Sequence, residues 1–293
     1  MRRKIRTITD FLTQVPDINA GIKFLQSKNI IEMTNTCENG HEMFLKGSRW
    51  RCQRRDCRKE KGIRVNNWLN GSRLPINSIM YFIYSWAHEL TSVTYCKREL
   101  NIGKNAVVDW NNYLREVCVW RMESNNNQVG GLNLIVEIDE SLFVRRNNNA
   151  GRILPQQWMF GGICRETKEC FIVSVPNRSE ITLIPIINRY IRHGSIIFSD
   201  SWKAYANLQQ HGFQHNQVNH KYNFVDPNSG IHTQNVERMW GAAKWGNKKR
   251  RGTDRNFLDS YLAEFMWRSK LNNSDPFETI LKDITEFWES HKA

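Results

Sequence analysis

The chain has 293 residues, and its 42 lysines and arginines outnumber its 29 aspartates and glutamates, which leaves a formal net charge of +13. This excess favours a polyanionic partner such as a nucleic acid, although a ribosome-associated or membrane-surface protein would carry a similar charge. The sequence has no run of about 18 apolar residues, so we expect no membrane span, and the start MRRKIRTITDF indicates no secretory signal.

The length allows roughly two domains, or one domain with appendages. Seven cysteines, an odd number, argue against a disulfide framework and favour free thiols or a metal site. Four of them lie outside any close-spaced group and are expected to be ordinary buried thiols: Cys96, Cys118, Cys164 and Cys170.

Residues 1–75 are polar and basic, with a short amphipathic helix expected near 17–28. Cys37 and His41 then lie four positions apart, and Cys52 and Cys57 lie five apart. Two close pairs joined by a short loop are typical of a small tetrahedral zinc site with three thiolates and one imidazole. The alternative is that His41 or Cys57 is incidental in a basic loop. Bound zinc should supply most of the folding free energy of so small a module.

Residues 76–122 are expected to be helical, with helices over 78–90 and 104–120. Around the turn at Asn101–Gly103, residues 92–117 have the layout of a helix-turn-helix, whose second helix reads the major groove. Plain structural packing is the alternative for such a helix pair. The packing face of the second helix should include Val107, Val108, Trp110 and Leu114. Its polar face should offer Lys104, Asn105, Asp109 and Asn112.

The Asn/Gly-rich segment 122–131 is typical of a linker and is the best domain boundary in the sequence. From 132 to 271 strands and helices alternate, and a C-terminal helix follows within 272–293. Strands are predicted at 133–143, 156–166, 169–176, 195–200 and 216–225. Helices are predicted at 179–193, 201–211, 232–246, 256–271 and 276–290. This order predicts a ribonuclease H-like α/β domain.

Three acidic residues stand out in that domain. Asp139 lies in the apolar run LIVEIDESLF, Asp200 closes the run SIIFSD, and Glu237 lies in the first turns of a predicted helix. Two carboxylates at the ends of buried strands and a third on a later helix suit phosphoryl transfer with two divalent ions. Hard oxygen ligands favour Mg²⁺ or Mn²⁺, two per site.

Each acid also has a simpler interpretation. By strand alternation Glu137 shares a face with Asp139, and together with Glu140 it is a rival for the same role. Asp200 is also a candidate N-cap. Glu237 is also interpretable as an exposed carboxylate near a helix N-terminus, but it shares a helical face with Trp240 and Lys244, whose ammonium would then reach the DNA backbone.

Four blocks carry a resemblance to a known family: VEIDES, FSDSWKAY (198–205), GIHTQNVERMWGAAKW (230–245) and YLAEFMWR (261–268). In this order they resemble the core of the Merlin group of cut-and-paste DNA transposases and of the related bacterial insertion-sequence transposases. The resemblance extends from the Cys/His cluster to about residue 270. It implies a DDE catalytic core formed by Asp139, Asp200 and Glu237, and a zinc-ribbon-like module near the N-terminus.

Double-stranded DNA, both transposon ends and target, is therefore the expected partner. A homodimer or higher oligomer is expected because two ends must be cut together. The resemblance implies a nuclear protein if the host is eukaryotic, and otherwise a cytoplasmic, nucleoid-associated one. Basic residues near the cysteines are expected to contact phosphates: Arg49, Arg51, Arg54, Arg55, Arg58, Lys59 and Lys61.

The run NKKRRGTDR (247–255) is either a DNA-backbone clamp or a solvated charged loop, with Lys248, Lys249, Arg250 and Arg251 as its candidate contacts. Two other classes of function remain open. A transposase-derived DNA-binding regulator would keep the N-terminal readers without catalysis, and a ribonuclease H-like nuclease would cut without joining strands.

Overall fold

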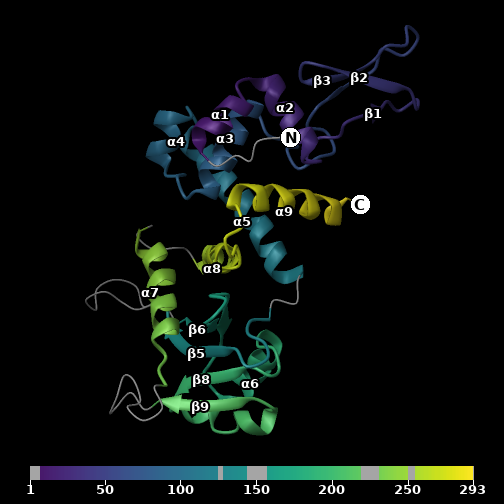
Figure 1. Ribbon diagram of the computed structural model, residues 1–293. Coiled ribbons are helices and arrows are strands. Elements are labelled where there is room, and N and C mark those ends of the chain that lie inside the picture. The colour runs from purple at the N-terminus through teal and green to yellow at the C-terminus, as the bar shows by residue number, and fades with distance from the viewer. Residues whose placement is uncertain (1–6, 125–127, 144–156, 219–230, 250–254, 293) are drawn as a thin grey trace. The chain divides into compact units, whose positions relative to one another are not determined.

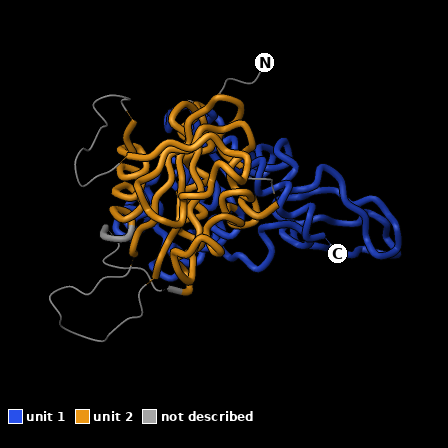
Figure 2. The backbone as a smooth tube through the Cα atoms, turned by 90° about the horizontal axis from the view of Figure 1, so that it is seen from below, with its two compact units in different colours: residues 1–117, 274–293 blue, residues 118–273 orange. Residues whose placement is uncertain are grey.

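A computed structural model describes residues 7–124, 128–143, 157–218, 231–249 and 255–292 of the chain. Its contacts divide the chain into two compact units, residues 1–117 with 274–293 and residues 118–273, coloured blue and orange in Figure 2. None of the described helices is both long and apolar enough to cross a bilayer.

Unit 1 contains a helical core (Figure 1). Its helices are α1 (Ile8–Gln14), α2 (Ile18–Ser27), α3 (Ile76–Ala87), α4 (Val93–Glu99), α9 (Pro276–His291) and the first part of α5 (Lys104–Ser124). Their aromatic faces meet: the Phe11 ring stacks on Tyr84 with centroids 4.7 Å apart and contacts Phe277 edge-on at 5.2 Å. The predicted helices over 17–28, 78–90, 104–120 and 276–290 are confirmed.

Unit 1 also carries an antiparallel four-stranded sheet, in the order β1 (Asn35–Thr36), β2 (Glu42–Lys46), β3 (Arg49–Cys52), β4 (Glu60–Gly62). Every second side chain of β3 is buried, and along β2 Met43 is buried and Leu45 half-buried, as a two-faced strand requires. Met43 and Trp50 form a small apolar cluster with Cys37 and Cys52. The hairpins therefore place the cysteines in the apolar cluster of this small sheet.

Unit 2 is built on a five-stranded mixed sheet with strand order β7-β6-β5-β8-β9. The strands β5 (Ile135–Leu142), β6 (Trp158–Cys164) and β7 (Cys170–Val175) are antiparallel neighbours. The strands β8 (Ile196–Asp200) and β9 (Gln214–Val218) run parallel to β5. This order and these directions are those of the ribonuclease H-like fold that the sequence predicts. The last predicted strand, 216–225, is confirmed only to Val218, because 219–225 lie outside the described residues.

Helices cover both faces of this sheet, so its strands are apolar on both sides. On one face α6 (Glu180–Tyr190) packs through Leu183, Ile184 and Ile187 onto the β5 residues Val136 and Ile138. On the other face α7 (Gln234–Lys249) and α8 (Arg255–Ser269) pack on β6 and β7. Even-numbered residues of β5 therefore face α6, and the odd-numbered ones, including Asp139, face α7.

Two predicted segments differ in the structure. The helix expected over 201–211 is two short 3₁₀ turns, η1 (Lys203–Tyr205) and η2 (Leu208–His211), because Trp202 has an extended backbone (φ −69°, ψ 134°) that stops a helix from starting at Ser201. The segment 122–131, predicted as a linker, begins inside α5 and ends with the buried Val129 bridged to Ile191; residues 125–127 lie outside the described residues.

Candidate active site and zinc-type cluster

Asp139 and Asp200 lie on the neighbouring strands β5 and β8 of the unit 2 sheet. The strands β5 and β8 are parallel neighbours, and Glu137 pairs with Phe198 in their ladder. Asp139 and Asp200 each follow two positions later, so the two strands carry them forward side by side. The carboxyl ends of neighbouring parallel strands are where α/β sheets place polar ligands. Asp200 also accepts a hydrogen bond from the Trp202 amide (3.0 Å), which is a local turn contact rather than the cap of a helix.

Glu237 lies in the first turn of α7 with an exposed side chain, and its charge acts on Asp139. The helix is seated closely on the sheet because Gly161, the β6 partner of Asp139, has no side chain. A Cβ atom at Gly161 would come within 2.9 Å of Cη2 of Trp240 and 2.8 Å of the Phe171 carbonyl oxygen. Trp240 is therefore a buried residue that packs α7 onto the sheet.

The charges of the acids reach one another. Burial, and then the carboxylates of Glu140, Asp200 and Glu237, raise the pKa of Asp139 to about 7. Asp139 is therefore within electrostatic reach of three other carboxylates, and their repulsion favours its protonated form. Such a donor set of hard oxygens fits Mg²⁺ or Mn²⁺, whose charge would relieve the repulsion.

Glu140 and Glu137, the two rivals of Asp139, have different surroundings. The Tyr205 hydroxyl donates to the Glu140 carboxylate, and Tyr205 belongs to the core cluster on the α6 face. Burial raises the pKa of Glu140, and the bond from Tyr205 opposes that rise. Glu137 lies on the α7 face with Asp139, but it is fully buried and its oxygens accept hydrogen bonds from α7. Glu140 and Glu137 therefore each have side-chain hydrogen-bond donors from the protein.

Three further side chains lie near the acids: Lys244, Arg178 and Trp202. The Lys244 ammonium donates to Ser141 Oγ (2.6 Å) on β5 and lies 5.7 Å from the centre of the Phe143 ring. Arg178 and Trp202 were not found by sequence reasoning, since an arginine in the loop after a strand gives no distinctive signal. The Arg178 guanidinium lies 4.4 Å from the centre of the Trp202 ring, and its charge lowers the pKa of Glu140.

The four predicted zinc ligands of unit 1 come together. The sulfur atoms of Cys37 and Cys57 are 3.7 Å apart, Cys52 Sγ lies 3.6 Å from His41 Nδ1, and all four ligand atoms are within 4.8 Å of one another. Two thiolates bound at about 2.3 Å to a tetrahedral zinc would be about 3.8 Å apart. A hydrogen bond from the Lys59 backbone amide contributes most to lowering the pKa of Cys57 to about 6, which favours a thiolate. The cluster can hold zinc.

No second group with such closely spaced ligand atoms occurs among the described residues. The carboxylates around Asp139 are thus gathered less tightly than the Cys/His cluster. Mutual repulsion between like charges is a sufficient physical reason. The other four cysteines are buried and form no disulfide bond, as predicted.

The predicted DNA contacts are distributed over both units. Arg49 and Arg51 are exposed on β3 and share Glu60 through ion pairs of 3.2 and 3.0 Å, while Arg54 and Arg55 are exposed in the following loop. The side chains of Lys248 and Lys249 lie outside the described residues, as do Arg250 and Arg251 entirely.

The helices α4 and α5 have the predicted helix-turn-helix order, with Asn101 in the left-handed region (φ 52°) between them. Lys104 and Asn105 are exposed, and the half-buried Asn112 accepts a hydrogen bond from Arg115. Val107, Trp110 and Leu114 are buried as expected. The assignment of Val108 to the packing face was wrong: its side chain is 45% exposed, on the outer side of the helix.

Comparison with known proteins agrees with this architecture. Residues 132–270 match the family model of the ISXO2-like transposase domain. An uncharacterized transposase-like protein of Haemophilus influenzae is 31% identical over 105 residues, which are 36% of this chain and 82% of that protein.

Solved structures with similarity to this chain include the HTLV-2 integrase catalytic core domain in complex with magnesium, in its trimeric form. It is 12% identical with a TM-score of 0.30 and covers 46% of this chain and 84% of that chain. A pre-cleavage Mos1 transpososome is 7% identical with a TM-score of 0.28, over 71% of this chain and 76% of that one.

The strand order and the helices on both faces define unit 2 as a ribonuclease H-like α/β unit. With the similarity to the Haemophilus influenzae protein, the chain belongs to the family of ISXO2-like transposases.

Proposed function

We propose that the chain is a cut-and-paste DNA transposase that binds the terminal inverted repeats of an element, cleaves the DNA there and joins the 3′ ends to target DNA. One observation carries the proposal. Asp139 lies on β5 and Asp200 ends the neighbouring parallel strand β8, and the charges of Asp200 and Glu237 act on Asp139. Three carboxylates from two strands and a helix, in a chain of this family, are the expected ligands for phosphodiester chemistry.

Asp139, Asp200 and Glu237 are the residues that would hold two Mg²⁺ or Mn²⁺ ions. When bound, such ions activate water for attack and stabilise the charge on the leaving 3′ oxygen. The helix α7 carries Glu237, and its buried Trp240 packs on Gly161 of β6, opposite Asp139. Joining exchanges one phosphodiester bond for another, since the freed 3′-hydroxyl attacks a target phosphate and a 3′ oxygen of the target leaves.

The remaining parts are assigned to DNA recognition. The Cys/His cluster with zinc would hold the arginine-bearing hairpins in place, and the exposed Arg54 and Arg55 would contact phosphates. Lys104 and Asn105 at the start of α5 would read the terminal repeat. The mechanism further requires a dimer or higher oligomer that acts on two ends. Membership of the Merlin group, and with it a nuclear location in a eukaryotic host, belongs to this proposal and is supported by the four sequence blocks.

A strand-transfer assay on linear fragments carrying candidate element ends, with supercoiled plasmid as target, tests the proposal. Wild-type protein should give joined products in Mg²⁺, and Asp200→Ala should abolish cleavage while leaving end binding within about twofold. A DNA-binding regulator would give binding alone, and a nuclease of the same fold would give nicks without joined products. Either result with the wild-type protein, or persistent cleavage by Asp200→Ala, would contradict the assignment.

A further inference from the structure

Glu137 is a fully buried carboxylate at the centre of unit 2. It lies on β5, two residues before Asp139 and on the same face, and none of its surface is exposed. An ionised carboxylate in such a place is strongly destabilising unless charged and hydrogen-bonding partners compensate for the lost water. The partners of Glu137 therefore indicate what this residue does.

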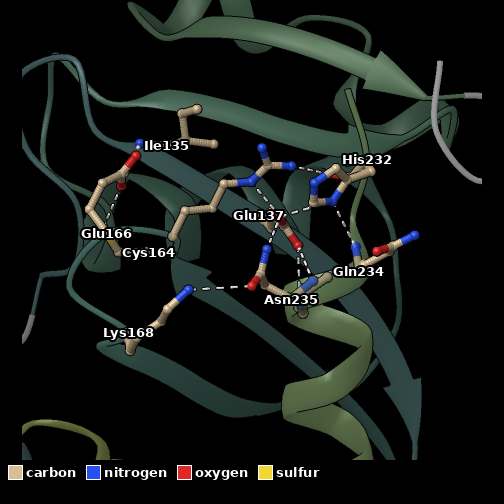
Figure 3. Close-up of polar contacts among 10 residues, drawn as sticks. Ile135, Glu137, Cys164, Glu166, Lys168, His232, Gln234 and Asn235 are labelled. Atoms are coloured by element: carbon tan, nitrogen blue, oxygen red, sulfur yellow. Dashed lines mark hydrogen bonds and ion pairs between the residues drawn. The ribbon is translucent and has the colours of Figure 1, made fainter. Parts of the chain in front are cut away.

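The first set of partners belongs to the start of α7. Glu137 Oε2 accepts hydrogen bonds from the backbone amides of Asn235 (2.7 Å) and Val236 (3.0 Å), and Oε1 accepts one from Asn235 Nδ2 (2.8 Å). Figure 3 shows Glu137 pointing from its strand at the first turn of that helix. These amides are among the N-terminal donors that have no partner inside a helix, and a negative charge is favourable there. A strand residue thus caps α7 from 98 positions away.

The second set of partners of Glu137 is Arg165 and His232. Arg165 Nε donates to Glu137 Oε1 (2.5 Å), and its Nη2 donates to the His232 carbonyl (2.6 Å) just before α7. The Arg165 backbone amide donates to the Ile135 carbonyl at the start of β5 (2.8 Å), and its guanidinium lies 4.6 Å from the centre of the Phe198 ring. His232 Nδ1 lies 3.6 Å from Glu137 Oε1 and accepts from the Gln234 amide (3.3 Å). Both Glu137 oxygens are therefore engaged by protein donors.

We infer that Glu137 is a positioning residue: it fixes the N-terminus of α7 on β5 and thereby sets Glu237 against Asp139. The inference rests on the proposed function. Glu237 directly follows Val236, whose amide Glu137 holds, and Asp139 follows Glu137 by two residues. The buried Glu137 side chain thus links the backbone next to Glu237 to the strand that carries Asp139. Because both of its oxygens already have donors, Glu137 is not itself a metal ligand.

The test is Glu137→Gln in the full chain, with Mn²⁺ as the probe. Glutamine keeps the shape but loses the charge and turns an NH₂ group toward donors, so the first turn of α7 should loosen. Hydrogen exchange of the peptide spanning 234–240 should be at least tenfold faster than in the wild type, and the Mn²⁺ affinity measured by electron paramagnetic resonance should be at least tenfold lower. Asn235→Ala removes one side-chain donor and keeps both backbone amides, so it should give smaller shifts in the same direction.

Glu166→Gln is the matched control, because the Glu166 carboxylate accepts the Ile135 amide (3.1 Å) at the exposed start of the same strand. It should change neither measurement. Faster exchange in Glu137→Gln with unchanged Mn²⁺ affinity would mean that Glu137 only caps the helix, which overturns the inference. Unchanged hydrogen exchange would overturn it as well. If Glu137→Gln does not fold, Asn235→Ala decides: wild-type Mn²⁺ affinity in that variant also overturns it.

Both measurements need no DNA, so their outcome is separate from that of the strand-transfer assay. Failure of the proposed function would appear as absent cleavage by wild-type protein that still binds Mn²⁺ at Asp139. In that case a shifted Mn²⁺ affinity in Glu137→Gln would still support the positioning role.

Discussion

At the scale of single residues, the packing of α7 on the sheet beside Asp139 depends on a glycine. Gly161 lies opposite Asp139 in the β5–β6 ladder and leaves the space that Trp240 fills. The neighbouring contact on the other side is a backbone carbonyl, that of Phe171, which cannot move without shifting β7. The fit of α7 on the sheet is thus set at one point by the absence of a Cβ atom.

Gly161→Ala should therefore lower the free energy of unfolding by about 1–3 kcal/mol, the usual range for overpacking a core. Urea unfolding followed by tryptophan fluorescence measures it. Gly241→Ala, one position after Trp240 on the exposed side of α7, meets nothing within 4 Å and should be stabilising by about 0.5–1 kcal/mol. Equal effects in the two variants would show that Trp240 does not pack against Gly161 in this way.

Sequence reasoning succeeds at this scale where the signal is local. Asp139 follows from its place inside an apolar run, Asp200 from an apolar run that it closes, and Cys37, His41, Cys52 and Cys57 from their spacing. The role of Glu137 does not, since its donors on α7 are 98 and 99 positions away and only the folded sheet brings them together. From the sequence, Glu137 and Glu140 are both candidates for the role of Asp139. Only their hydrogen-bond partners in the structure distinguish them.

At the scale of elements, the four-stranded sheet of unit 1 has too small an apolar cluster to be stable alone. Cys52→Ser should release zinc and unfold residues 35–62, because the metal would supply most of the folding free energy. Zinc content by atomic absorption and circular dichroism measure the two effects. Cys96→Ala removes a buried thiol from α4 and should leave the zinc content unchanged. Full zinc content in Cys52→Ser would end the assignment.

The strand β9 makes stability depend on pH. Burial lowers the pKa of His215 to about 4, and its Nε2 lies 2.9 Å from Ser199 Oγ on β8. In the unfolded chain the imidazole takes up its proton near pH 6.5. Between about pH 6.5 and 4 the unfolded state therefore binds more protons, and the free energy of unfolding falls as the pH falls.

His215→Asn should remove this contribution, which we expect to be about 1–2 kcal/mol after allowance for partial exposure of the ring. Urea midpoints of the two proteins between pH 7 and pH 5 measure it, and the wild type should lose more stability than the variant. Parallel pH curves would contradict this, because they would mean that the pKa of the His215 imidazole is the same in the folded and unfolded states.

Prediction of elements was accurate wherever periodicity was clear, as for the strands β5 to β8 and the helices α6 and α7. It failed for residues 201–211, where buried Tyr205 and Leu208 lie three positions apart. That spacing suits a 3₁₀ turn as well as an α-helix, and the extended backbone of Trp202 decides between them. The short α1 was not predicted, although Thr7 and Asp10 form the capping box that marks its start.

At the scale of the whole molecule, the two proposed tasks, DNA recognition and catalysis, are assigned to different compact units. Unit 1 holds the Cys/His cluster and the helix-turn-helix, and unit 2 holds the carboxylates. The assignment of the C-terminal helix α9 to unit 1 could not be predicted from the sequence. It depends on the packing of Phe277 against Phe11, at opposite ends of the chain, and not on any local pattern.

This division predicts how DNA affinity responds to salt. Replacing Arg54 and Arg55 by alanine should weaken end binding and reduce the slope of log K against log salt by about 2, since each phosphate contact contributes about 0.9. Replacing Arg49 and Arg51 should reduce it less, because both are already paired with Glu60. Fluorescence anisotropy at about 50 to 200 mM salt measures this slope. An unchanged slope in the Arg54/Arg55 variant would remove that loop from the DNA interface.

The central claim is that Asp139, Asp200 and Glu237 share one metal-binding site. Anomalous X-ray diffraction from crystals of the full chain grown with MnCl₂ tests it most directly. We expect anomalous density bounded by the carboxylates of those three residues, and its loss in Asp139→Asn. Manganese bound elsewhere, with these carboxylates turned away from one another, would contradict the claim.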